Sequence, residues 1–352
     1  MNSKIRIRES EKCEAFLRRW LWVCEILMLL TIFTMYAVRN NPSVNFIAMN
    51  GTYQNYNPVR RLLNGQIPMQ DFQDYLGMGH LYLGTFMTAL FGGDYHASLY
   101  AFDFLTMLST LLIFWAIGHS VLRDKTLTTT TTCLAFFLVI TGCLSICEKV
   151  PLIGRMIGVL SKGLDAGNSA RIIRGMILPI VLALLLLSDR FLPTVVKKAK
   201  IPDGFNRWLP AIVTGLIAGF AFVWSNDYGI SCWVCLTIIM GWTSLSRFRR
   251  LGPAILDVLV ELVASLVSLL VFVWLATQGN FMLWLQSIVG VGGYQRWYYN
   301  SDKAYYLFDL EYSKWILLQA AVCIAYMVAL FRNRGSREVV IRYGVPALAN
   351  MV

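Results

Sequence analysis

The sequence predicts an all-α protein, a polytopic bundle of about eight transmembrane helices with short helices along the extracytoplasmic membrane surface. Composition is the first observation behind this prediction. Of its 352 residues, 57% are hydrophobic and 14% are charged, whereas a soluble domain has about 25% charged residues. The mean hydropathy of +0.57 also suits a lipid environment. This composition excludes a soluble enzyme, a disordered chain and a coiled coil.

The length of the apolar runs is the second observation. A helix needs roughly 20 apolar residues to cross a bilayer. The segments that meet this requirement are 20–38, 97–118, 127–147, 173–189, 208–225, 229–246, 254–277 and 314–331. A further apolar stretch, 81–91, is too short to span. We expect it to form a helix that lies on the membrane surface or dips into it.

The distribution of positive charge is the third observation, and it sets the orientation. Cytoplasmic loops carry an excess of Lys and Arg. If 81–91 does not span, the basic clusters fall on the side of the N-terminal segment 1–19, in the loops that begin at Arg123, Arg190, Arg247 and Arg332. The net charge of +11 therefore reflects topology and not nucleic-acid binding. The sequence predicts a multi-pass membrane protein with a cytoplasmic N-terminus.

These runs divide the chain into three parts. Residues 1–19 are predicted to be a cytoplasmic segment, and residues 20–338 a single transmembrane module. The end, 339–352, resembles the start of a further membrane segment or a truncated end. The long outer loops of the module are 39–96, 148–172 and 278–313. The last of these is rich in Tyr and Trp, which favour the headgroup level.

Acidic residues on the predicted outer face are candidates for a general base. Asp71 and Asp74 follow a Gly-containing and Pro-containing turn, and Asp227 lies in a polar break between two apolar runs. Ionisable groups at such a break mark a site by default. Asp165 precedes a helix that it could also cap. For Asp227, an ordinary tight turn is the competing interpretation.

Basic residues on the same face oppose the topology rule. A phosphate-bearing ligand would account for them, because Arg binds phosphate in a bidentate manner. Contact with lipid headgroups would account for them as well. The basic residues singled out are Arg60, Arg61, Lys162, Arg171, Arg174 and Arg296.

Cysteine and histidine give no metal or redox signal. Cys232 and Cys235 form a CxxC pattern inside an apolar run, where Cys behaves as a small hydrophobic residue. The three His residues lack metal-ligand spacing. We predict no metal site and no cofactor. A divalent cation stays open as an alternative, although no residue pattern supports one.

Two blocks resemble the GT-C membrane glycosyltransferases. The first runs from Asn57 to Phe72, followed by Tyr75 and the apolar stretch that ends in Phe91-Gly92. It resembles the first outer loop of that family, which reads Gly-x-x-Pro-Tyr-x-Asp-Phe before a short apolar helix. The second block, Gly215 to Gly229, resembles the family's Gly-Leu-x-x-Gly-Leu-Ala-Phe helix and its polar end.

The resemblance implies a GT-C-like fold and a glycosyltransferase of a bacterial inner or plasma membrane. Such an enzyme transfers a sugar from a polyprenyl-phosphate donor to a glycan or lipid acceptor on the extracytoplasmic face. The outer carboxylates would then be catalytic, and the basic residues would hold the donor phosphate. The residues expected to contact the sugar or acceptor are Tyr75, His80, Trp297 and Tyr298.

One departure from the family keeps two alternatives open. The family places an acid early in the first outer loop, whereas residues 39–70 contain no Asp or Glu. A non-catalytic GT-C-like subunit would account for this loss. A transporter or flippase of lipid-linked sugars would instead need charges within the membrane. The acids inside apolar runs are Glu25, Asp103, Asp257 and Glu261.

Overall fold

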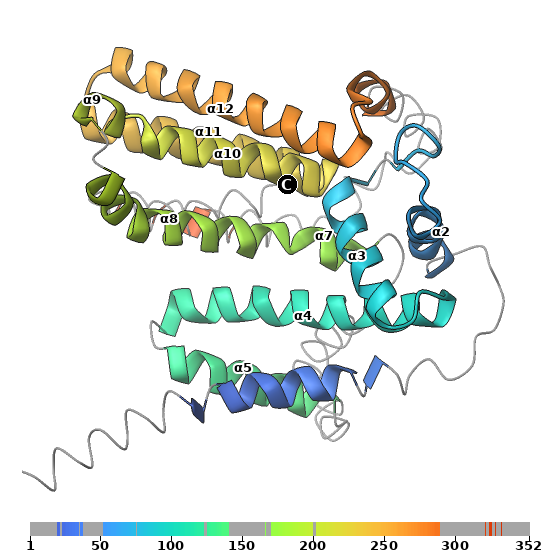
Figure 1. Cartoon of the computed structure of the whole chain (residues 1–352). Coiled ribbons are helices and arrows are strands. Elements are labelled where there is room, and N and C mark those ends of the chain that lie inside the picture. Colours follow the sequence, from blue (N-terminus) through green and yellow to red (C-terminus); the bar gives the residue numbers. More distant parts are fainter. Residues whose placement is uncertain are drawn as a thin grey trace, which may run out of the picture. The chain divides into compact units, whose positions relative to one another are not determined.

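A computed structural model of the chain is mainly helical in the part that it describes (Figure 1). The described residues are 20–21, 23–34, 36–37, 52–74, 76–122, 125–140, 166, 170–199, 202–288 and the single positions 321, 324, 325, 328 and 332. Within them, a single bridge between Pro68 and Phe72 is the only β-type pairing. The predicted all-α class is confirmed.

The chain forms two compact units. The first comprises Met1–Asn57 and Gly84–Met176, and the second comprises Pro58–Leu83 and Ile177–Val352. The division falls within two helices, α2 (Thr52–Leu63) and α3 (Met78–Leu90).

The first unit contains the helix Val23–Thr34, α4 (Tyr95–Leu122), α5 (Lys125–Ile140) and the short α7 (Arg171–Gly175). The threonine run at the start of α5 links its helices. Thr129 accepts a hydrogen bond from the Trp115 indole of α4 at 3.1 Å, and Thr130 donates to Glu25 Oε1 at 3.0 Å. The core of this unit consists of Leu29, Phe33, Ala37, Met107, Leu111 and Cys133.

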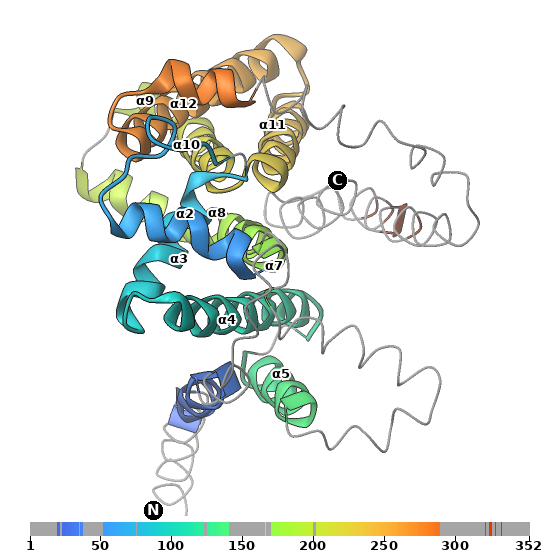
Figure 2. The same cartoon turned by 90° about the vertical axis from the view of Figure 1, so that its right-hand side faces the viewer.

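The second unit contains α8 (Ile177–Ala199), α9 (Asp203–Asn206), α10 (Leu209–Trp224), α11 (Asn226–Phe248), α12 (Leu251–Thr277) and a further helix at 281–288. The helices α10, α11 and α12 lie side by side (Figures 1 and 2). Ser225 alone separates α10 from α11, and Arg249 and Arg250 separate α11 from α12.

Three helices are long and apolar enough to cross a membrane, counted over the described residues. They are Gly204–Trp224, Asn226–Phe248 and Leu251–Thr277. They correspond to the predicted segments 208–225, 229–246 and 254–277, which supports a membrane protein. Helices also cover much of 97–118, 127–147 and 173–189, but they are not among these three candidates. Segment 314–331 lies mainly outside the described residues, so the total of eight spans stays a prediction.

Small residues bring α10 and α12 into close contact. A Cβ atom at Gly215 would collide with the carbonyl oxygen of Glu261, and one at Gly219 with that of Ser265. Ser268 Oγ donates a hydrogen bond to the carbonyl oxygen of Leu216 at 2.7 Å. Small residues at such spacing allow membrane helices to approach backbone to backbone, where dispersion contacts replace the hydrophobic effect.

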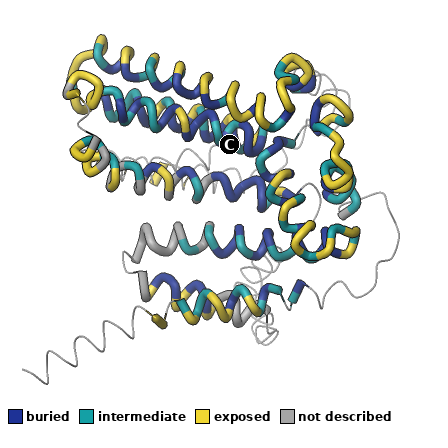
Figure 3. Tube along the Cα trace, viewed as in Figure 1, coloured by how far each residue is buried: buried dark blue, intermediate teal, exposed yellow. Residues whose placement is uncertain are grey.

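The opposite side of α12 is apolar and exposed (Figure 3). Its exposed residues recur at helical spacing and include Ile255, Leu259, Val263, Leu266, Leu270 and Trp274. Such a continuous apolar surface would be costly in water but is suited to contact with lipid chains.

Candidate functional site

The segment between α2 and α3 forms the fixed turn that the sequence predicted. Asp71 Oδ2 accepts a hydrogen bond from the backbone N–H of Ile67 at 2.7 Å. Arg61 Nη1 donates to the carbonyl oxygen of Asp71 at 3.1 Å, and its guanidinium lies 5.6 Å from the centre of the Phe72 ring. Met69 has a φ of +70°, a left-handed conformation uncommon outside glycine. Asp71 and Arg61 therefore hold the turn itself.

Apolar and polar contacts anchor this turn to the other helices of the second unit. Met69 and Met78 share a core with Val223 of α10, Val273 of α12 and Trp284. At its edge, the amide nitrogen of Asn280 donates to Gln70 Oε1 at 3.0 Å. The segment thus lies where α10 and α12 end.

The start of α3 lies against the break between α10 and α11. The N–H of Asn226 donates to the carbonyl oxygen of Leu76 at 3.0 Å. His80 Nδ1 lies 3.1 Å from the carbonyl oxygen of Trp224, which is a hydrogen-bond distance. That carbonyl belongs to the last residue of α10. The last C=O groups of a helix have no hydrogen-bond donor within the same helix. His80, predicted to contact sugar or acceptor, is buried at this position.

Two glycines that the sequence reasoning did not single out make this approach possible. A Cβ atom at Gly77 would lie 2.5 Å from the Cα of Ser225, and one at Gly79 would lie 2.7 Å from the Cα of Trp224. Gly77 also has a φ of +118°, which side-chain-bearing residues rarely adopt. The available signal was the pair of glycines flanking Met78 at the start of an apolar helix.

Two of the predicted acids lie on the two segments that this contact joins. Asp74 is buried, and its Oδ1 accepts a hydrogen bond from the N–H of Leu76 at 2.9 Å. Asp227 is exposed in the first turn of α11. Its Oδ1 accepts hydrogen bonds from Ser225 Oγ and, at 3.0 Å, from the N–H of Tyr228.

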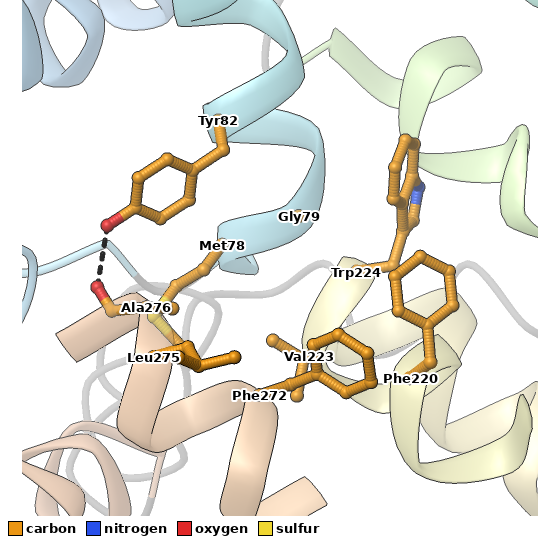
Figure 4. A pocket seen from close by; sticks show the side chains of 9 residues that line it. All are labelled: Met78, Gly79, Tyr82, Phe220, Val223, Trp224, Phe272, Leu275 and Ala276. Atoms are coloured by element: carbon orange, nitrogen blue, oxygen red, sulfur yellow. Dashed lines mark hydrogen bonds between the residues drawn. The ribbon is translucent and has the colours of Figure 1, made fainter. Parts of the chain in front are cut away.

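An apolar pocket of about 230 Å³ lies beside these segments (Figure 4). Helix α3 contributes Met78, Gly79 and Tyr82, and the other walls come from the ends of α10 and α12. Those walls are Phe220, Val223, Trp224, Phe272, Leu275 and Ala276. The pocket is open to the outside and almost entirely apolar, so it suits a hydrocarbon chain better than a polar ligand.

A tyrosine supplies the polar contact at the rim of this pocket. The Tyr82 hydroxyl donates a hydrogen bond to the carbonyl oxygen of Ala276 at 2.6 Å (Figure 4). Partial burial raises the pKa of the Tyr82 phenol above its ordinary value. The phenol therefore stays protonated and remains a donor at neutral pH.

We expect Tyr82→Phe to loosen α3 from the end of α12 while keeping the ring in place. Loss of this hydrogen bond should lower the free energy of unfolding by about 1 kcal/mol. Thermal unfolding in lipid nanodiscs measures the change. Tyr100→Phe is a matched control, because its ring packs edge-on against Phe91 and its hydroxyl takes part in none of the hydrogen bonds found among the described residues. An equal loss in both variants would contradict the role assigned to the Tyr82 hydroxyl.

The other predicted site residues that the structure describes lie on helices α2 and α7. Arg60 is exposed in the last turn of α2, near Arg61. Arg171 and Arg174 belong to α7 in the first unit, where Arg171 is exposed and Arg174 is buried. The remaining candidates lie outside the described residues: Tyr75, Lys162, Asp165, Arg296, Trp297 and Tyr298.

Metal-type side chains do not gather in this part of the chain. Among the described residues, no group of three or more His, Cys, Asp or Glu could hold a metal ion. Cys232 and Cys235 are free and buried within α11.

Comparisons with protein families, with characterised proteins and with solved structures find no match to this chain.

Proposed function

We propose that the protein is an integral-membrane glycosyltransferase of GT-C type. It would transfer a sugar from a polyprenyl-phosphate donor to a glycan or lipid acceptor on the extracytoplasmic face. The observation that carries this proposal is the apolar pocket at the ends of α10 and α12, beside the segments that bear Asp74 and Asp227. A donor of this class needs an apolar groove for its chain next to polar groups for its head.

The charges at the two ends of the helix group support the orientation. Exposed basic residues cluster around the junction of α11 and α12, at Arg247, Arg249 and Arg250. The guanidinium of Arg207 lies over the rings of Trp208 and Phe248, 4.6 and 5.0 Å from their centres. Asp227 lies at the opposite end of α11. By the positive-inside rule, the basic end faces the cytoplasm and the acidic end faces outward.

Among the acids, Asp227 has the properties required of the general base. It is exposed, and the bonds from Ser225 and Tyr228 fix the orientation of its carboxylate. Asp227 would take the proton from the acceptor hydroxyl as the acceptor oxygen bonds to the anomeric carbon. The bond between that carbon and the phosphate oxygen breaks, and the polyprenyl phosphate leaves with the electron pair.

The neighbouring residues would have supporting roles. Asp74 holds the entry to α3 through Leu76, and Asp71 holds the turn through Ile67. The exposed Arg60 would pair with the departing phosphate, since arginine binds phosphate oxygens in a bidentate manner.

A second candidate function is a non-catalytic membrane subunit that keeps this architecture. The local use of Asp71 and Asp74 favours it, because each carboxylate bonds to the backbone of its own turn. Such a protein would bind lipid-linked sugar without turning it over. Binding and turnover must therefore be measured separately.

The experiment that tests donor binding places a larger side chain in the pocket. In lipid nanodiscs, we expect saturable binding of polyprenyl-phosphate sugar by the unmodified protein. Ala276→Leu should weaken this binding at least about tenfold, because the added atoms occupy space that one segment of the lipid chain would fill. Radiolabelled donor measures the affinity.

The matched control is Val267→Leu, on the exposed apolar surface of the same helix. It should leave the affinity unchanged. Equal affinity in Ala276→Leu and Val267→Leu would rule out the pocket as the lipid site. Absence of binding to every lipid-phosphate sugar tested would contradict the glycosyltransferase proposal.

A further inference from the structure

Two carboxyl groups lie within the candidate membrane spans, away from the pocket. Asp257 and Glu261 are one turn apart on α12, so they share one side of that helix. Their side chains are 4% and 0% exposed. Neither residue belongs to the site described above.

Each carboxyl group is bonded on one oxygen to a hydroxyl group of α11. Ser244 Oγ donates to Asp257 Oδ2 at 2.6 Å, and Thr237 Oγ1 donates to Glu261 Oε2 at 3.1 Å. The second oxygen of each, Asp257 Oδ1 and Glu261 Oε1, is buried without a hydrogen-bond partner among the described residues. The two hydroxyl donors thus serve only two of the four carboxyl oxygens.

The neighbouring helices offer little charge to balance this pair. Helix α10 has no ionisable residue. Its Gly215 lies against the backbone carbonyl of Glu261. Helix α11 carries Asp227, Tyr228, Cys232, Cys235 and Arg247. The Arg247 side chain is exposed, and its guanidinium lies 5.1 Å from the centre of the Phe248 ring. Two negative charges in this position would be costly in a membrane unless a cation neutralised them.

We propose that Asp257 and Glu261, with Ser244 and Thr237, form a proton-binding site inside the pair of helices α11 and α12. At neutral pH the site holds at least one proton, which neutralises one of the two buried carboxylates. All of the side-chain atoms that would bind the proton are carboxyl or hydroxyl oxygens. Oxygen atoms also coordinate Na⁺, so Na⁺ is the competing ligand to test. This site is independent of the glycosyltransferase proposal.

Infrared difference spectroscopy of the full-length protein in nanodiscs tests the proposal. We expect a protonated-carboxyl C=O band at neutral pH that shifts in D₂O and disappears reversibly at alkaline pH. Glu261→Gln and Asp257→Asn should each remove part of this band, and the double variant should remove all of this contribution. Thr237→Val should shift the band without removing it, because the carboxyl group loses a hydrogen bond but remains.

The control variant is Asp94→Asn, which changes an exposed acid and should leave the band unchanged. Addition of NaCl, compared with choline chloride at the same ionic strength, separates the two cations. Loss of the band with Na⁺ alone would identify Na⁺ as a second occupant of the proposed site. If no band depends on Asp257 or Glu261, or if their band persists at every pH at which the protein stays folded, the proposal is wrong. The acids would then be fixed links between helices.

Discussion

Gly215→Leu is expected to prevent α10 and α12 from packing together. A Cβ atom at this position would collide with the carbonyl oxygen of Glu261 and lie 2.8 Å from the Cβ of Ala264. Because backbone atoms form this contact, rotation of a side chain cannot relieve it. We expect a loss of roughly 3 kcal/mol or more, at or beyond the upper end of the range for overpacked cores. Unfolding in detergent, followed by circular dichroism, measures the loss.

A graded series checks that the effect comes from this contact. Gly215→Ala should lose less than Gly215→Leu, and Gly219→Ala should behave like Gly215→Ala, since its Cβ would lie 2.7 Å from the Cβ of Ser268. Gly252→Ala is the matched control, because no heavy atom lies within 4 Å of its added Cβ. Equal stability of Gly215→Ala and Gly252→Ala would contradict the close packing of α10 against α12.

Asp227→Asn is expected to abolish most of the proposed sugar transfer while the protein stays folded. The amide oxygen of asparagine can still accept hydrogen bonds from Ser225 and Tyr228, so the start of α11 should keep its geometry. It cannot take a proton from an acceptor hydroxyl. We expect turnover to fall about 10²- to 10⁴-fold, the usual contribution of a general base. Single-turnover kinetics with radiolabelled donor in nanodiscs measures the rate.

Asp71→Asn gives the comparison, since an amide oxygen there can still accept the N–H of Ile67. It should change the rate much less than Asp227→Asn. Ser225→Ala should give an intermediate rate, because the carboxylate would lose one of the groups that orient it. Full activity in Asp227→Asn would assign the proton transfer to another residue. Donor binding without turnover in the unmodified protein would favour the non-catalytic subunit.

Local sequence predicted the turn that contains Asp71 correctly. Gly and Pro restrict the backbone at Asn64 to Asp71, and the carboxylate of Asp71 bonds within four residues of itself. The break at Ser225 was also predicted from local sequence, because polar residues there separate two apolar runs. Both features depend on neighbours in the chain, and these are visible in the sequence.

The packing roles of glycines were not predicted from the sequence. Gly215 and Gly219 were noted only as members of the block that resembles GT-C glycosyltransferases, and Gly77 was not singled out. What each glycine does depends on a backbone many residues away, such as Glu261 for Gly215 and Ser225 for Gly77. A single sequence carries no record of which backbone approaches which glycine.

The sequence by itself determined that this protein is helical and suited to a membrane, because apolar runs of helical length fix both properties locally. It also determined which residues could serve as acids or bases. Only the tertiary structure decided that the Leu76 backbone meets Asn226, that Tyr82 reaches Ala276, and that an apolar pocket forms at the ends of α10 and α12. These contacts join segments about 150 to 200 residues apart. Their geometry arises from packing, which hydrophobic periodicity along the chain does not reveal.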